Sequence, residues 1–325
     1  MDKRVRRNTE LSYAFEPAKK PVLRVDQGER FVVETEDNLT GRVRSEKDLP
    51  TDSHLEPFSG YSPPKHNPMS GPIWVKGAHN GDILEVSIEK IVPADHGISC
   101  IFPGIGPMCD SMKWPELAGP YTKVIRHIPG PSGDTSDGKA VYNEKIEWDL
   151  RPFVGTIGVA AEYEVHSSLL GQGPWGGNWD CRDIAPPNRL LLPCFHEGGL
   201  LYLGDVHAGQ GDAEWMGTAD EVRAEVTLSC RVIKNRSIPY ARIVREDAII
   251  SICSDKPLEE AIRRATLYLM EWMIDEYRFT PKDAYIVISA NPDFRVNVYQ
   301  MVLNCPGLSY TAGALLPKKY LAAPR

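Results

Sequence analysis

The sequence predicts an α+β protein that is rich in β-strands, with sandwich-like or barrel-like sheets and a helical segment near the C-terminus. The first observation is that 27 prolines and 27 glycines break most of the first 250 residues into short segments. The second is that apolar, β-branched runs lie between these breaks, which is typical of strands. The third is a single long run with helical spacing after residue 250. Strands followed by helices indicate α+β rather than a βαβ series.

Several of these runs alternate apolar and polar residues, the period-two pattern of a strand with one buried face. In residues 221–234, alternate positions hold Val222, Ala224, Val226 and Leu228. Comparable runs occupy residues 21–37, 81–94, 145–164 and 240–253. Proline between the runs suits loops and sheet edges.

The helical region begins with Ser254 and Asp255 as capping candidates, followed by a proline and two glutamates in the first turn. Because apolar residues then recur every three or four positions, a helix is predicted over 257–277. Thr280 and the proline after it predict the start of a second, shorter helix. Residues 294–304 are predicted to form a closing strand.

The bulk properties narrow the class of protein. The length of 325 residues suits one large domain or two ordinary ones. The predicted division places a β-rich region with the chemical motifs at 1–250 and a helix-containing region at 251–325. The net charge of −7 argues against a nucleic-acid partner, which would require a basic patch.

Membranes and secretion are also disfavoured. No apolar run approaches the roughly 20 residues that a membrane-spanning helix needs, and the N-terminal stretch lacks the apolar segment of a secretory signal. Seven scattered cysteines without a CxxC pair suit reduced thiols. The expected location is therefore cytoplasmic.

Residues 202–217, YLGDVHAGQGDAEWMG, contain the densest group of metal-ligand side chains. Residues two apart in a strand face the same side, so Asp205 and His207 would project together. Asp212 and Glu214 form a second such pair after a glycine-rich loop. Mixed imidazole and carboxylate sets bind Zn²⁺ and related ions. The structural alternative is an exposed polar hairpin loop with a satisfied histidine.

Residues 173–183, GPWGGNWDCRD, form a second candidate segment. Asp180 is a further possible ligand, while Asn178 and the aromatic rings of Trp175 and Trp179 are predicted to contact a small substrate. Glycines here would let the backbone approach a ligand closely. The alternative is a glycine-rich turn whose tryptophans only pack.

Two earlier segments complete the set. Glu34, Glu36 and Asp37 lie at the end of an apparent strand, and residues 66–84 read as a turn, a strand and a hairpin turn at HNGD, residues 79–82. Acidic strand ends and Gly/Asn turns are also common without any function.

Together these segments resemble the acetamidase/formamidase family in order and approximate spacing. The matching stretches are ETEDNLTG at 34–41, NPMSGPIWVKGAHNGDIL at 67–84, GPWGGNWD at 173–180 and GDVHAGQGDAE at 204–214. The resemblance implies a metal-dependent hydrolase that cleaves a small amide, such as formamide or acetamide, to a carboxylate and ammonia. It also implies a β-rich fold and a homodimer or larger homo-oligomer.

The chain departs from the family pattern at three places. Ala213 stands where many members have glycine, and the segment 158–173 differs from the usual GVAP stretch. The segment 103–117 is also distinctive. These segments are expected to reshape the substrate pocket rather than change the reaction.

The resemblance and the residue types suggest roles for the acids. The predicted metal ligands are Asp180, Asp205 and His207. Glu214 is predicted to be either a fourth ligand or the general base, and the other catalytic candidates are Glu34 and Asp37. The expected metal is Zn²⁺, with Mn²⁺ or Fe²⁺ as alternatives.

Two other functions compete with this one. In a cysteine-nucleophile amidase, Cys181 beside Asp180 would attack the amide, but a thiolate needs positive surroundings and Cys181 lies among acids. In a non-enzymatic β-rich protein, a structural Ca²⁺ would bind four carboxylates, which are those of Asp180, Asp205, Asp212 and Glu214. His207 argues against a pure Ca²⁺ site.

Overall fold

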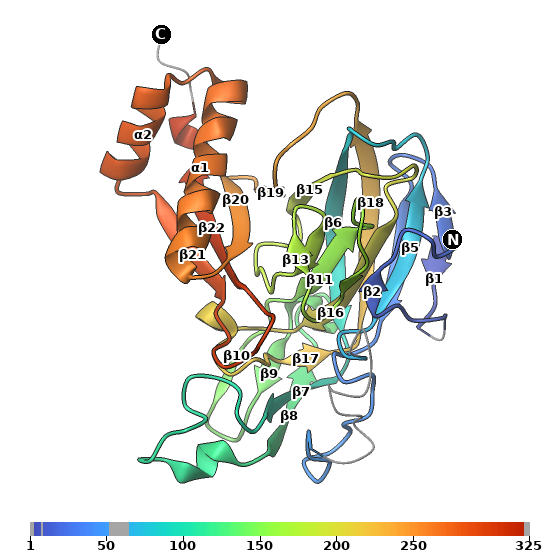
Figure 1. The fold of residues 1–325 in the computed structure, drawn as a ribbon. Helices are drawn as coiled ribbons and strands as arrows, with labels where there is room; N and C mark the ends of the chain where they lie inside the picture. Colours follow the sequence, from blue (N-terminus) through green and yellow to red (C-terminus); the bar gives the residue numbers. More distant parts are fainter. Residues whose placement is uncertain (1–2, 8, 52–64, 322–325) are drawn as a thin grey trace.

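A computed structural model describes residues 3–7, 9–51 and 65–321, and it confirms a β-rich α+β fold (Figure 1). One sheet has nine strands, in the order β1 (Lys3–Val5), β4 (Arg30–Thr35), β18 (Ala224–Ile233), β6 (Ile83–Pro93), β15 (Arg189–Pro193), β19 (Arg242–Val244), β20 (Ala248–Asp255), β22 (Tyr310–Pro317) and β21 (Arg295–Gln300).

The second sheet has eleven strands. Its main path is β10 (Glu147–Asp149), β9 (Lys139–Val141), β8 (Tyr121–Ile128), β7 (His96–Ile101), β17 (Glu221–Val222), β16 (Leu201–His207), β11 (Phe153–Val159), β14 (Gly176–Asn178) and β13 (Gln172–Gly173). Two more strands join through β16, namely β5 (Met69–Val75) and then β3 (Leu23–Val25). Each path begins and ends on different strands, so the sheets are open rather than closed barrels.

Smaller elements lie outside the two large sheets. A two-stranded ribbon joins β2 (Ala14–Phe15) to β12 (His166–Ser167). Short 3₁₀ helices occupy Pro115–Ala118, Thr135–Asp137, Asp212–Glu214 and Lys318–Tyr320.

One core fills the space between the sheets. It joins residues such as Val86 and Leu228 of the nine-stranded sheet to Val154 and Leu203 of the eleven-stranded sheet. The predicted alternation is confirmed on β18, where the apolar residues at 224, 226, 228 and 230 are buried and the residues between them are more exposed. Apolar burial of this kind contributes roughly 25 cal/mol per Å².

The predicted helices are confirmed as α1 (Leu258–Tyr277) and α2 (Pro281–Ala290). α1 packs against β20 and β22, and α2 packs on α1 (Figure 1). The Thr280 hydroxyl accepts a hydrogen bond from the Asp283 N–H at 3.1 Å and caps α2 as expected. Ser254 and Asp255 instead end β20, so Pro257 occupies the N-cap of α1.

The boundary predicted at residue 250, between the β-rich region and the helix-containing region, falls inside a strand of the nine-stranded sheet. β20 spans the boundary at residue 250, and β20 to β22 continue the sheet that begins with β1 and β4. The division at 250 stays a prediction, and the two segments share the nine-stranded sheet.

The prediction of a hairpin at residues 79–82 is wrong. The segment is a turn, with the Asp82 N–H donating to the His79 carbonyl at 3.2 Å. However, β5 belongs to the eleven-stranded sheet and β6 to the nine-stranded one. The turn therefore carries the chain from one sheet to the other, because the two strands that it joins are not paired.

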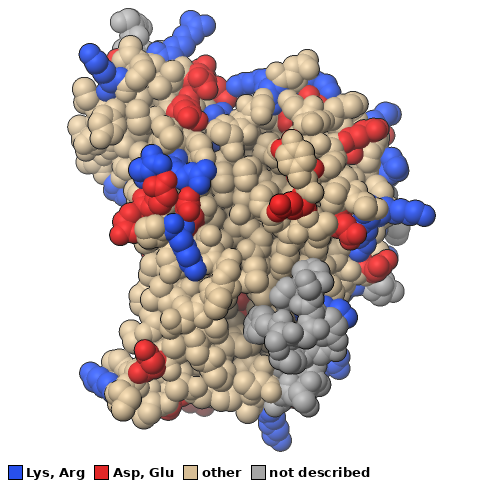
Figure 2. Space-filling model, viewed as in Figure 1, with Lys and Arg blue, Asp and Glu red and all other residues tan. Residues whose placement is uncertain are grey.

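Among the described residues, no helix has the length and apolar character needed to cross a bilayer. All seven cysteines are free thiols. On the face drawn in Figure 2, basic and acidic side chains are interspersed over the upper part, and few of either kind lie over β7 to β10. No basic stripe crosses this face, in line with the acidic net charge.

Candidate metal centre and active site

Five buried side chains gather where β16 ends, and they form the centre referred to below as the acid–imidazole cluster. Its members are Asp180, Asp205, His207, Glu214 and Glu221. Each has 6% or less of its surface exposed. Their ligand atoms fall within 4.8 Å of one another in two groups that share His207, one containing Asp180 and Asp205 and the other Glu214 and Glu221.

The imidazole of His207 lies at the middle of the cluster. Its Nε2 is 3.2 Å from Glu221 Oε2, 3.6 Å from Asp205 Oδ1 and 3.8 Å from Asp180 Oδ1. These four buried atoms have no hydrogen-bond partner among the described residues. Buried polar groups are rarely left in this state, so their convergence requires an explanation.

Sheet register brings the cluster together. Asp205 and His207 alternate on β16, and the antiparallel partner β17 places Glu221 opposite His207. On the other side of β16, Phe153 of β11 pairs with His207 and packs its ring edge-on at 4.9 Å between centroids. Asp180 follows β14, and Glu214 is the last residue of the 3₁₀ helix Asp212–Glu214 that follows β16.

The backbone is strained at three of the acids. Asp180, Asp205 and Glu214 have φ values of 47°, 54° and 46°, in the left-handed region. A side chain other than glycine held there costs about 1–3 kcal/mol, and such residues cluster at functional sites. At the neighbouring Gly155, an added Cβ would lie 2.7 Å from Asp180 Oδ1, so only glycine leaves room for these carboxylates.

Within the described part of the chain, hydrogen bonds fix Asp205 through a single oxygen, Oδ2. Its Oδ2 accepts from Asn67 Nδ2 at 2.8 Å and from Thr156 Oγ1 at 2.9 Å. The Thr156 hydroxyl is shared with Asn178 Oδ1 at 2.8 Å, and Asn178 Nδ2 in turn donates to the Leu169 carbonyl at 3.0 Å. This arrangement leaves Asp205 Oδ1 directed at the cluster.

Gln210 fixes the tautomer of His207. Its Nε2 donates to the carbonyl oxygens of Asp180 at 3.0 Å and Tyr299 at 2.9 Å, so its Oε1 is the atom that faces His207 Nδ1 at 2.8 Å. Nδ1 must therefore carry the proton and donate. Nε2 then faces the carboxylates as the atom that can bind a metal, the arrangement typical of metal-ligating histidines.

The charges of the cluster do not balance among its own residues. Four carboxyl groups surround one imidazole, and no Lys or Arg of the described residues forms an ion pair with them. Burial raises the pKa of Asp180 to about 6 and that of Glu221 to about 7. Burial and the Asp180 carboxylate raise the pKa of Glu214 well above its usual range.

His207 responds in the opposite sense. Burial opposes its charged form, yet the nearby carboxylates of Glu221 and Asp205 raise the pKa of His207 well above its usual range. A buried group of this composition needs added positive charge. One divalent cation would satisfy the unpartnered atoms and offset the negative charge, so the residues present fit such an ion.

The structure brings together all four predicted ligands, which are Asp180, Asp205, His207 and Glu214. Asp212, the fourth acid of the calcium alternative, lies outside the cluster. Its side chain is 73% exposed and pairs with Arg182.

The two other catalytic candidates also lie outside the cluster. Glu34 forms ion pairs with Arg4 at 2.9 Å and Arg6 at 3.0 Å. Although burial acts to raise its pKa, hydrogen bonds from the Arg7 N–H and from the two guanidinium groups hold the pKa of Glu34 below its usual range. Asp37 closes a turn, with its Oδ1 accepting from backbone N–H groups at 3.0 and 2.9 Å.

The predicted substrate-binding residues have other contacts. Trp179 is fully buried in the core, 6.1 Å from the Tyr240 ring, so it packs rather than lining a pocket. Trp175 stacks on His166 with ring centroids 3.9 Å apart and lines a separate cavity of about 610 Å³. The Asn178 side chain accepts a hydrogen bond from Thr156 Oγ1, which also lies at hydrogen-bond distance from Asp205.

Sequence reasoning missed Glu221 and the polar residues that hold the ligands, which are Asn67, Thr156, Gln210 and Gln300. For Glu221 the sequence offered an acidic pair at residues 220–221, shortly after the glycine-rich loop, but this pair does not by itself indicate the pairing of Glu221 with His207. The amides and the threonine carry no such pattern.

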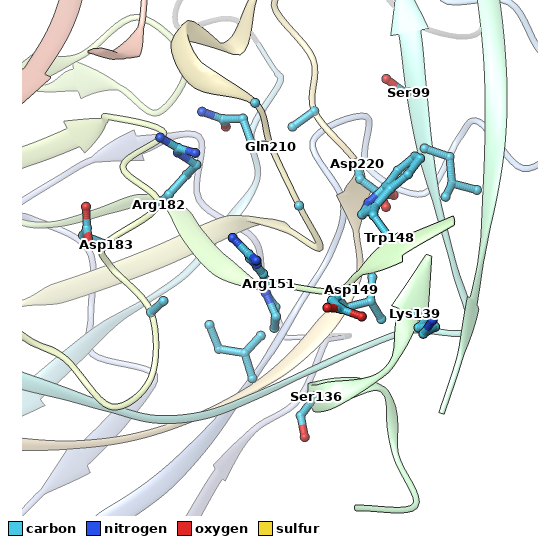
Figure 3. A pocket seen from close by; sticks show the side chains of 18 of the residues that line it. Ser99, Ser136, Lys139, Trp148, Asp149, Arg151, Arg182, Asp183, Gln210 and Asp220 are labelled. Carbon is cyan, nitrogen blue, oxygen red and sulfur yellow. The ribbon is translucent and has the colours of Figure 1, made fainter. Parts of the chain in front are cut away.

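A cleft of about 1570 Å³ lies beside the cluster. Figure 3 shows Arg151, Arg182 and Gln210 on one side of it and Trp148 on the other. The five cluster side chains do not line this cleft. Gln210 does, and it hydrogen-bonds His207, so it connects the cleft wall to the cluster.

The fold and the cluster define a β-rich protein with a buried carboxylate–imidazole centre suited to a divalent cation. Comparison with known families adds a specific assignment. The model of the Acetamidase/Formamidase family matches residues 1–172 and 170–319. The chain therefore belongs to this family, which confirms the resemblance seen in its motifs.

Individual relatives agree. A Schizosaccharomyces pombe protein with a provisional formamidase name is 24% identical over 261 residues, covering 65% of this chain and 61% of that protein. An acetamidase of Mycolicibacterium smegmatis is 30% identical over 199 residues, covering 45% and 48%. The chain thus matches about half to three fifths of the length of these curated relatives.

A solved structure covers more of the chain. An acetamidase from Yersinia enterocolitica is 33% identical, with a TM-score of 0.84, and the match covers 96% of this chain and 90% of that one. The two-sheet arrangement is therefore a shared fold.

Proposed function

We propose that this chain hydrolyses a small amide, of the formamide or acetamide kind, to a carboxylate and ammonia with the help of one divalent metal ion. The observation that carries the proposal is the convergence of three buried carboxylate oxygens on His207 Nε2, where none of the four atoms has a hydrogen-bond partner among the described residues. Membership of the Acetamidase/Formamidase family supplies the reaction class.

The proposed ligands are Asp180, Asp205, His207 and Glu221. A metal held by them would polarise the amide carbonyl and lower the pKa of a bound water towards neutrality. Zn²⁺ is the first choice because one imidazole and several carboxylates suit it, and Mn²⁺ or Fe²⁺ accept the same set. The hydrogen bonds to Asp205 Oδ2 and His207 Nδ1 hold two ligands in place.

Glu214 is the proposed proton-transfer residue. Its carboxyl group lies beside Asp180 and His207. Burial and the Asp180 carboxylate raise its pKa well above the usual range, so its environment favours the protonated form that can donate to a leaving nitrogen. It would take a proton from the attacking water and deliver it to the departing nitrogen, so that the amide C–N bond breaks as the new C–O bond forms. General acid–base catalysis of this kind contributes about 10²- to 10⁴-fold.

The structure offers less support to the other two functions. Cys181 is fully buried, and burial raises its pKa well above the usual range, which disfavours the thiolate that a nucleophile requires. A structural Ca²⁺ would bind six to eight oxygens. The exposed Asp212 is outside the cluster and His207 is at its centre, so the donor set suits Zn²⁺ better.

Two further expectations accompany the proposal. A homodimer or larger homo-oligomer follows from the family resemblance alone, and light scattering on the purified protein would measure it. A cytoplasmic location fits the seven free thiols.

The test is ammonia release from a panel of linear amides, with protein as purified, protein treated with a chelator, and treated protein resupplied with one divalent ion. The proposal expects turnover that stops on chelation and returns with the ion. Turnover that is insensitive to chelation but stops with iodoacetamide would favour Cys181. A protein that binds Ca²⁺ and turns over no amide would favour the non-enzymatic alternative.

A further inference from the structure

A chain of glutamine side chains reaches the cluster from the C-terminal part of the protein. Gln300, the last residue of β21, is fully buried and donates through Nε2 to Oδ2 of Asp180. Its Oε1 accepts from Gln172 Nε2 at 2.6 Å. Gln172 lies on β13, at the end of the eleven-stranded sheet.

The direction of every hydrogen bond in this chain is fixed. The backbone N–H of Ser309 can only donate, and it lies 2.8 Å from Gln172 Oε1. The NH₂ group of Gln172 must therefore point the other way, where it donates to the Asn178 carbonyl at 2.6 Å and to Gln300 Oε1. Gln300 in turn presents its NH₂ group to Asp180. The usual ambiguity between amide oxygen and nitrogen does not arise.

This directionality determines which oxygen of Asp180 is available. Oδ2 must accept a hydrogen bond from Gln300, so it cannot carry a proton on that side. Oδ1 is the oxygen directed at His207, 3.8 Å from Nε2, and it has no partner among the described residues. Asp205 shows the same pattern, with donors at Oδ2 and an unpartnered Oδ1.

We propose that Gln300, oriented by Gln172, is a positioning residue that aims Asp180 Oδ1 at the metal. The inference rests on the proposed metal site. It gives the edge strand β21 of the nine-stranded sheet a part in a centre whose candidate ligands all come from residues 180–221. Both glutamines act through Asp180, and neither contacts the substrate in this account.

The test is the Zn²⁺ affinity of chelator-treated protein, measured by competition with a chromophoric chelator for the wild type, Gln300→Ala and Gln172→Ala. Loss of a residue that orients a metal ligand lowers affinity by about 10- to 100-fold. Gln300→Glu is a second variant of nearly the same shape, and it places an acceptor where Asp180 Oδ2 needs a donor. It should lower Zn²⁺ affinity by a similar factor.

Thr311→Val is the matched control. Thr311 is fully buried, and its Oγ1 accepts a hydrogen bond from Gln172 Nε2 at 3.2 Å. It is not part of the three hydrogen bonds that run from the Ser309 N–H through Gln172 and Gln300 to Asp180. It should bind Zn²⁺ like the wild type. The urea unfolding midpoint of each metal-free protein is measured as well. A general packing defect would lower that midpoint without changing Zn²⁺ affinity, whereas loss of the positioning role would lower the affinity.

The outcomes distinguish this inference from the proposed function. A wild type that binds no divalent ion would contradict both. A wild type that binds Zn²⁺ tightly, with glutamine variants of equal affinity, would leave the metal site standing and overturn the positioning role. Reduced affinity in Gln300→Glu and Gln172→Ala, with Thr311→Val unchanged, would support it.

Discussion

The Nδ1 atom of His207 lies 2.8 Å from Oε1 of Gln210, and the two carbonyl groups that hold the Gln210 amide fix the direction of this bond. The proton on His207 is thereby assigned to Nδ1, so that Nε2 can bind a cation. One glutamine thus links the wall of the large cleft to the centre of the acid–imidazole cluster.

Replacing Gln210 tests this link. Gln210→Ala removes the acceptor at Nδ1, so Zn²⁺ affinity should fall by about 10- to 100-fold as the imidazole loses its fixed orientation. Chelator competition measures the change. Gln27→Ala is the control, because Gln27 also bonds two backbone groups but on an exposed turn. Equal losses in both variants would contradict the assigned role.

Glu221 and Asp212 provide a paired test of the ligand set. Glu221→Gln replaces a carboxylate whose Oε2 lies 3.2 Å from His207 Nε2 with a neutral amide. The amount of metal bound per chain should therefore fall sharply. Asp212→Asn changes an exposed acid paired with Arg182 and should leave metal content unchanged. Elemental analysis after dialysis gives both values. If Asp212→Asn loses its metal and Glu221→Gln does not, the alternative calcium set that includes Asp212 would be favoured instead.

Glu214 separates proton transfer from metal binding. Glu214→Gln keeps the shape of the side chain but cannot accept a proton, so kcat should fall by about 10²- to 10⁴-fold while the metal stays bound. Steady-state ammonia release and metal content are measured on the same preparation. Should the variant lose its metal instead, Glu214 is a ligand, the other role that the sequence left open.

The sequence was informative where chemistry is local. Asp205 and His207 were identified because strand geometry puts residues two apart on one face, and the long helix because its spacing and start signals agree. Glu221 was missed because its position opposite His207 depends on the pairing of β17 with β16, which no local pattern encodes. The contact between Gln300 and Asp180 depends on how the strands of the two sheets are arranged, and the sequence near either residue does not indicate it.

Trp179 lies elsewhere than its sequence context suggests, whereas Trp175 does line a cavity. Aromatic residues beside glycines suggested a substrate wall, but Trp179 turns into the core between the sheets. Burial of a large ring there stabilises the fold, and the sequence alone does not distinguish that use from a pocket. Glu34 was similarly chosen because it lies at the acidic end of a strand. In the structure it forms ion pairs with Arg4 and Arg6 of the neighbouring N-terminal segment.

Asp37 predicts a pH effect on stability. Burial raises its pKa to about 6 from an ordinary 3.8. The folded carboxyl group therefore holds its proton more tightly than the unfolded one, so this group favours folding below pH 3.8, and that contribution is lost as the pH rises to 6.

Asp37→Asn keeps the acceptor at Oδ1 but cannot ionise. Its free energy of unfolding relative to the wild type should rise between pH 4 and pH 7 by about 2 kcal/mol, because most of a shift of about two pKa units acts within this range. Urea unfolding of both proteins across this range measures the difference. A difference that stays constant with pH would contradict the assignment. Retained amide turnover would also argue against the catalytic role predicted for Asp37.

The most direct test of the central claim is a titration of chelator-treated protein with Zn²⁺, in which bound metal and ammonia release from a small amide are measured in the same samples. A single catalytic metal per chain predicts that both rise together and reach their plateaus at one equivalent per chain. Full turnover in protein that holds no metal, or metal that binds at one equivalent without restoring turnover of any amide in the panel, would contradict it.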